Sequence, residues 1–111
     1  MTAEAVRELV ECEVAEDWSL PNAHGCDLRR CLVPPTLREY DDSGWRLPTE
    51  SHPVVRLWLV LEELPEDCSG YKIVYGEEAM MFGLAVPGMA GAPRDVFIGY
   101  YGSFLDTYRG M

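Results

Sequence analysis

Lysine is almost absent from this chain, and basic residues of any kind are scarce. Of the nine basic residues only Lys72 is a lysine, against 19 acidic residues, and the formal net charge is −10. Proteins that bind nucleic acid through its phosphates need clusters of lysine and arginine. Because the basic residues are scattered here, the sequence argues against a nucleic-acid partner. An acidic surface keeps a protein soluble and attracts basic partners.

The chain also lacks a long apolar run. Its longest uncharged stretch, residues 79–93, is interrupted by glycines and two prolines, whereas a helix that spans a bilayer takes about 20 apolar residues. The first 14 residues carry charged side chains instead of the apolar centre of a signal peptide. We therefore expect no membrane span and a cytoplasmic location.

Motifs for metal, phosphate or covalent chemistry are missing as well. The four cysteines, Cys12, Cys26, Cys31 and Cys68, are irregularly spaced, whereas structural zinc sites take cysteines in closely spaced pairs. In a reducing compartment these cysteines should be free thiols. The sequence contains no EF-hand register, no phosphate-binding loop and no nucleophile elbow. We therefore predict no metal and no cofactor.

The apolar sequence that is present suffices for one domain over residues 1–111. With 48% hydrophobic residues, a chain of this length buries about two-thirds of its unfolded surface. Residues 54–63 lie between prolines and are rich in β-branched and aromatic side chains, which predicts a central strand. Its odd positions are all apolar and should face the core. Its even positions place Val54, Trp58 and Val60 around Arg56, so we expect that face to be only partly covered.

The remaining elements follow from periodicity and from turn residues. Residues 3–17 form an amphipathic pattern with Thr2 as N-cap, and Ser103 begins a capping-box pattern for a short helix up to Tyr108. A strand over residues 28–33 should end at the proline pair 34–35, at a sheet edge, with residues 36–40 as a candidate continuation after the break. Further strands are predicted over residues 71–75, 79–86 and 95–99. The fold class is α+β, a four- to five-stranded antiparallel meander sheet with an N-terminal helix and a short C-terminal helix.

Small residues mark one face of the predicted strand 79–86. Gly83 and Ala85 share this face with Met81, and small side chains allow close approach of another element. We therefore expect a helix to cover the face formed by Met81, Gly83 and Ala85.

A meander brings its connecting segments to two ends of the sheet. One end should hold a histidine, two carboxylates and two phenols, which are groups suited to acid–base chemistry or to a ligand pocket: His52, Glu77, Glu78, Tyr100 and Tyr101. The alternative is that they are solvated turn residues. The other end should hold four carboxylates within six residues, costly to bury and therefore expected in water: Glu62, Glu63, Glu66 and Asp67.

Two functions from different classes follow. The first is a small acidic binding module, of the inhibitor or immunity type, that engages a basic protein through Glu62, Glu63, Glu66, Asp67 and Trp58. The second is a small enzyme or ligand-binding domain that uses the end with Glu77 and Tyr100; a deep pocket there would favour it. The lack of a catalytic motif favours the binding module over an enzyme. The partly covered face around Arg56 also predicts a homodimer, because exposed apolar patches usually mark interfaces. The alternative is that residues 28–40 or the loop at Trp45 fold over this face.

Overall fold

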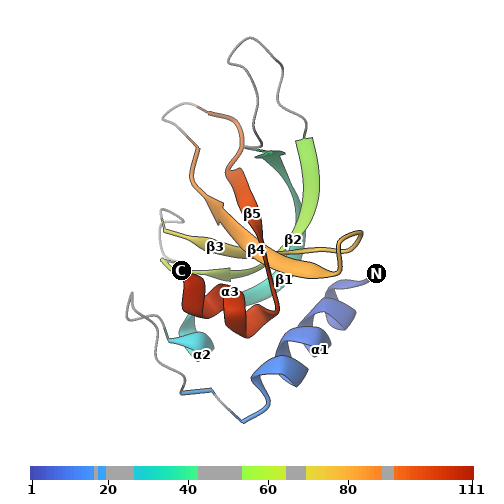
Figure 1. The fold of residues 1–111 in the computed structure, drawn as a ribbon, viewed down its shortest axis with the longest axis vertical. Coiled ribbons are helices and arrows are strands. Elements are labelled where there is room, and N and C mark those ends of the chain that lie inside the picture. The colour runs from blue at the N-terminus through green and yellow to red at the C-terminus, as the bar shows by residue number, and fades with distance from the viewer. Residues whose placement is uncertain (17, 20–26, 43–53, 65–69, 89–91) are drawn as a thin grey trace.

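Five strands in the described part of the chain close into a small barrel, and two helices pack on one side of it (Figure 1). The structure, a computed structural model, describes residues 1–16, 18–19, 27–42, 54–64, 70–88 and 92–111. The strands are β1 (Leu32–Asp42), β2 (Val54–Glu62), β3 (Lys72–Gly76), β4 (Met81–Val86) and β5 (Val96–Gly102). The helices are α1 (Ala3–Val14), α2 (Leu28–Cys31) and α3 (Phe104–Gly110). The predicted α+β fold, an antiparallel meander between an N-terminal and a short C-terminal helix, is confirmed.

The barrel closes where the first strand meets the last. Each strand is antiparallel to the next, so β1 and β5 run in the same direction. They pair through Asp41 with Val96 and Asp42 with Phe97, and the Asp41 N–H donates to the Asp95 carbonyl at 2.9 Å. Closure therefore pairs the two edge strands over these residues and shortens the unpaired edges of the sheet.

The segment before β1 differs from its prediction. Residues 28–31, expected as a strand, form the single turn of α2, because the Asp27 side chain caps it and accepts from the Arg29 N–H at 3.0 Å. The strand begins at Leu32 and runs through both prolines, which were expected to end it. Its register with β2 shifts at this point. Such a bulge tolerates proline, because the residue there need not donate to the neighbouring strand.

Buried side chains divide between an inner core and an outer core. The inner core consists of apolar residues from all five strands: Tyr40, Leu57, Leu59, Val74, Ala85 and Phe97. The outer core joins the outside of the barrel to α1 and α3, with Val6, Val10, Val14, Val60, Leu61, Ile73, Tyr75, Phe82, Leu84, Phe104 and Tyr108 among its members. On β2 the odd positions 57 and 59 share a core as predicted. A register shift between Leu59 and Leu61 then sends both Val60 and Leu61 to the outer core.

The even face of β2 is more completely covered than the sequence suggested. Val60 is buried in the outer core with Val6 and Val10 of α1, and Trp58 is half-buried against the same cluster. Only Val54 and Arg56 at the start of the strand are exposed. Only the first residues of β2 therefore leave this face exposed to solvent.

The face of β4 that a helix covers is the opposite of the predicted one. Helix α3 packs on Phe82 and Leu84, and the rings of Phe82 and Phe104 lie 5.6 Å apart, edge to face. Ala85 belongs to the inner core, and Met81 is exposed. The small residues of this strand thus serve the crowded barrel interior, where neighbouring strands approach, and the large ones meet the helix.

A carboxylate joins the two helices. Glu13 of α1 accepts a hydrogen bond from the Phe104 N–H at 3.0 Å, at the start of α3. Burial raises the pKa of Glu13, and the hydrogen bond from Phe104 acts in the opposite direction. Ser103 caps α3 as predicted, with its hydroxyl oxygen accepting from the Asp106 N–H at 3.1 Å. These contacts fix α1 and α3 beside each other on the barrel (Figure 1).

Candidate functional site

The first carboxylate of the acidic end predicted around residues 62–67, that of Glu62, is not exposed to solvent. Glu62 is buried, and its Oε1 lies 3.9 Å from the Nζ of Lys72 on the neighbouring strand. Glu63 is half-buried, and its Oε2 accepts from the Tyr71 N–H at 3.1 Å. Glu66 and Asp67 lie outside the described residues. The expectation that this cluster is solvated is therefore wrong for Glu62, which forms a buried ion pair with Lys72.

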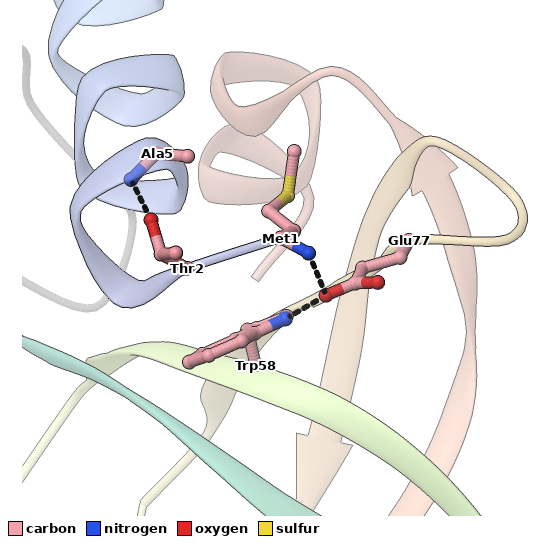
Figure 2. Close-up of polar contacts among 5 residues, drawn as sticks. All are labelled: Met1, Thr2, Ala5, Trp58 and Glu77. Carbon is pink, nitrogen blue, oxygen red and sulfur yellow. Dashed lines mark hydrogen bonds and ion pairs between the residues drawn. The ribbon is translucent and has the colours of Figure 1, made fainter.

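Trp58, predicted to belong with that acidic end, lies instead at the other one. Its indole Nε1–H donates to Oε1 of Glu77 at 2.7 Å (Figure 2). The amino group of Met1 lies 3.7 Å from the same oxygen. Glu77 is therefore held in place from two sides, although its side chain is still exposed at the β3–β4 turn.

The structure brings together three of the five residues predicted at this second end. Glu77, Glu78 and Tyr100 line an open hollow of about 410 Å³, together with exposed apolar side chains of β1 and β2, Leu37 and Val54. His52 lies outside the described residues. Tyr101 is not part of the hollow. Its ring lies against Gly110 of α3, because successive residues of a strand point to opposite faces.

Tyr100 forms one wall of the hollow. Its ring lies edge to face with Phe97, with centroids 4.8 Å apart, and it packs so closely on Gly76 that a Cβ there would lie 2.9 Å from Cζ. Burial raises the pKa of Tyr100, and the carboxylates of Asp42 and Glu78 raise it further. At neutral pH the phenol is therefore a neutral hydrogen-bond donor and is not suited to act as a base.

The turn beside the hollow holds a strained and exposed methionine. Met80 has a positive φ of 54°, and its N–H donates to the Gly76 carbonyl at 2.8 Å. Its side chain is 77% exposed. The left-handed conformation costs a residue with a Cβ about 1 to 2 kcal/mol. Strain of this kind tends to collect at functional sites, and here it adjoins the two exposed carboxylates.

We expect Met80→Gly to stabilise the protein by about 0.5 to 1 kcal/mol, because glycine removes the left-handed strain while losing some chain entropy of its own. Urea unfolding measures the change. Met80→Ala is the matched control, since it removes the same side chain but keeps a Cβ at positive φ. Equal stabilities of the two variants would show that the strain is not what matters at this position.

The most buried polar cluster among the described residues was not predicted from the sequence. Lys72 is 1% exposed, and its Nζ lies 3.3 Å from Oδ2 of Asp95 and 3.9 Å from Oε1 of Glu62. Tyr40 is buried nearby, and burial raises the pKa of its hydroxyl, with Arg38 acting in the opposite direction. The alternation of β3 could have predicted the burial of Lys72, because Lys72 lies on the same face of the strand as the buried Val74.

The hollow around Glu77 combines the carboxylates of Glu77 and Glu78 with an apolar wall, and Arg56 lines it as well. A cationic group can therefore be received on the side where the two carboxylates lie. In the described ranges no three His, Cys, Asp or Glu side chains are grouped to hold a metal ion. No helix among these residues is long and apolar enough to cross a membrane. Comparison of the chain with models of protein families, with curated protein sequences and with solved structures found no match.

Proposed function

We propose that this chain is a small acidic, cytoplasmic binding module, of the inhibitor or immunity type, that docks a basic protein at the hollow lined by Glu77, Glu78 and Tyr100. The observation that carries the proposal is the placement of exposed carboxylates beside the exposed apolar side chains of Leu37 and Val54. A lysine or arginine of a partner has the matching form, a cationic head on an apolar stem.

The rigidity of the hollow supports this proposal. Leu37 and Val54 are 38% and 42% exposed on two paired strands, so they present apolar surface without first being ordered. Glu77 is already held by Trp58. Side chains fixed before binding lose less conformational entropy when a partner arrives. The net charge of −10 would raise the association rate with a basic partner, and salt would screen that gain.

Two further features bear on the proposal. Cys12 is an exposed thiol, and the buried Cys31 thiol donates to the Glu63 carbonyl oxygen at 3.5 Å. Reduced cysteines are typical of proteins in a reducing compartment. The segment with Glu63, Glu66 and Asp67 remains a second proposed contact for the same partner, and a weaker one, since Glu62 is engaged with Lys72.

A small-molecule ligand is the second candidate, and the size of the hollow favours it. About 410 Å³ lies within the range of small-ligand sites, and Tyr100 supplies a hydrogen-bond donor. Because the neutral phenol is a poor base, we propose binding and no catalysis. Native mass spectrometry of protein purified from its source would reveal a bound small cation.

The docking proposal predicts that Glu77→Gln/Glu78→Gln loses its partner. Immobilised protein would be exposed to source lysate at low salt, and the retained basic protein identified by mass. Retention should fall at least tenfold in the double variant, because two charges leave the hollow. The amide that replaces the Glu77 carboxylate keeps an oxygen that can accept from Trp58, so the fold should persist.

The control variant is Glu4→Gln/Glu8→Gln, which removes two exposed charges from α1 and alters the net charge equally. It should retain the partner. A third variant, Glu63→Gln/Glu66→Gln/Asp67→Asn, tests the other acidic segment. Equal retention by all three variants, or binding that does not respond to ionic strength, would contradict the proposal.

A homodimer remains a proposal that depends on the same exposed residues. With Val60 buried and Trp58 half-buried, a second copy has Val54 and Arg56 of the predicted face left to contact. Dimer formation should therefore compete with the basic partner. Sedimentation at high protein concentration tests it, and a strict monomer would exclude the dimer.

A further inference from the structure

The hollow around Glu77 and Glu78 also holds a charge of the opposite sign. Arg56 of β2 lines it, beside the apolar side chains of Leu37 and Val54. Arg56 is exposed, and it forms no ion pair with any other residue that the structure describes. One hollow therefore presents a guanidinium group and two carboxylates that do not neutralise one another by direct contact.

The antiparallel pairing of β2 and β3 brings these charges to one face of the sheet. Trp58 pairs with Tyr75, so Arg56, two residues before Trp58, and Glu77, two residues after Tyr75, lie on neighbouring strands at the same level. Side chains two residues apart share a face of a strand. The hydrogen bond from the Trp58 indole to Glu77 confirms that the carboxylate lies on the face of Trp58. Arg56 and Glu77 therefore project from the same side of the two strands.

The carboxylate end of the hollow extends beyond Glu77. The Oε1 of Glu77 is engaged by Trp58 and by the terminal amino group. Burial first, and then nearby carboxylates, among them that of Glu78, raise the pKa of Tyr100. Glu78 therefore lies near the phenol in the same hollow. A ligand ammonium group can meet Glu78 while Glu77 keeps its contacts within the chain.

We propose that this hollow binds an ammonium group and a carboxylate joined by an apolar stem, as a lysine with a free carboxylate presents them. The ammonium group meets Glu77 and Glu78, and the carboxylate meets the planar fork of Arg56. The methylene stem lies along Leu37 and Val54. This proposal rests on the docking of a cationic group at Glu77 and Glu78, and it adds the opposite charge that the ligand must carry.

Two sources present this chemistry, free lysine and the C-terminal lysine of a basic protein. Both are small enough at the binding end for a hollow of about 410 Å³. A lysine within a chain has no carboxylate of its own, and its ammonium group alone would be repelled by Arg56. Arg56 therefore selects for the free carboxylate, which distinguishes this ligand from cationic side chains in general.

Titration followed by amide NMR shifts tests the hollow with three probes of similar length at constant ionic strength. ε-Aminocaproate carries both charged groups, pentylamine only the ammonium group and caproate only the carboxylate. We expect ε-aminocaproate to bind saturably, with shifts near Val54 and Glu78, and about fivefold more tightly than pentylamine. The gain is modest because Arg56 is exposed to solvent. Caproate should show no saturable binding, because the two carboxylates of the hollow repel it.

Variants at the two ends of the hollow assign each charge of the ligand to its partner. Arg56→Gln should lower the affinity for ε-aminocaproate to that for pentylamine, without weakening the binding of pentylamine. Arg56→Lys should keep part of the gain, since it retains the charge but not the fork. Glu77→Gln/Glu78→Gln should abolish saturable binding of both amines. Arg7→Gln removes an exposed cation from α1, and as the matched control it should bind both amines as the wild type does.

Nα-Acetyl-lysine distinguishes the two sources of the ligand. It presents the ammonium group and the carboxylate of a C-terminal lysine, and it lacks the second ammonium group of the free amino acid. Binding as tight as that of lysine would assign the hollow to the C-terminal lysine of a protein. Weaker binding than that of lysine would assign it to the free amino acid.

The same titrations separate a failure of this inference from a failure of the docking proposal. Pentylamine that binds as tightly as ε-aminocaproate, or an Arg56→Gln variant with unchanged affinities, would overturn the inference and leave the docking of a cation at Glu77 intact. The absence of saturable binding by either amine would overturn the inference as well. In that case retention of a basic protein by the wild type, and its loss in Glu77→Gln/Glu78→Gln, would still support docking.

Discussion

Replacing Lys72 by methionine should lower the free energy of unfolding by about 3 to 5 kcal/mol, the usual cost of breaking a buried ion pair by removing one partner. Lys72 is 1% exposed, and its Nζ lies 3.3 Å from Asp95 and 3.9 Å from Glu62. Methionine fills a similar volume, so packing changes little. The loss comes from the carboxylates, which keep their charges but lose the cation that faces them.

The rescue variant distinguishes charge from packing. Lys72→Met/Glu62→Gln also neutralises the more buried carboxylate, and it should recover much of the lost stability, because a neutral amide is far less costly to bury than a charge. Arg7→Met, an exposed site on α1, is the control with the same change of net charge, and it should stay within about 0.5 kcal/mol of the wild type. Urea unfolding at neutral pH measures all four proteins. A loss in Lys72→Met that matches the control would mean that solvent already screens this cluster.

Local signals in the sequence predicted most of the elements. Thr2 caps α1 and Ser103 caps α3, each through a side-chain oxygen that accepts from a backbone N–H of the first turn. The alternation of β2 correctly paired Leu57 with Leu59 in one core. These features depend on neighbouring residues, so one sequence contains them. The turn at α2 was missed because Asp27 was not recognised as its cap.

Features that depend on distant residues were not predictable in the same way. Barrel closure joins Asp41 to Val96, and a meander has the same local pattern whether it is open or closed. The bulge after Leu59 reverses the alternation of β2, so that Leu61 changes core. Strand alternation alone therefore fails beyond each bulge.

The candidate site was predicted in part for the same reason. The order of the meander placed the β3–β4 turn near the segment with Tyr100, and in the structure Glu77, Glu78 and Tyr100 line one hollow. Tyr101 was misplaced, because the strand predicted over residues 95–99 ended before it, whereas β5 continues to Gly102.

Gly83→Leu should destabilise the protein by about 1 to 3 kcal/mol through overpacking, for a reason that only the barrel reveals. Gly83 lies in β4 between β3 and β5, and the register with β5 shifts on both sides of the Gly83–Leu84 pair. A Cβ at Gly83 would collide with the backbone carbonyl oxygen of Gly99 and lie 2.9 Å from Cε1 of Phe97. The carbonyl belongs to a paired strand, so it cannot move aside as the end of a flexible side chain can.

A two-step series tests this cause. Most of the loss should already occur in Gly83→Ala, because the collision begins at Cβ, and leucine should add less. If a helix covered this face, alanine would be tolerated and leucine alone would be costly. Met81→Leu, a substitution of similar volume at an exposed position on the same strand, should change stability by less than about 0.5 kcal/mol. Urea unfolding of the three variants decides between the two accounts, and a Gly83→Ala protein as stable as the wild type would show that β4 and β5 have room to separate at this point.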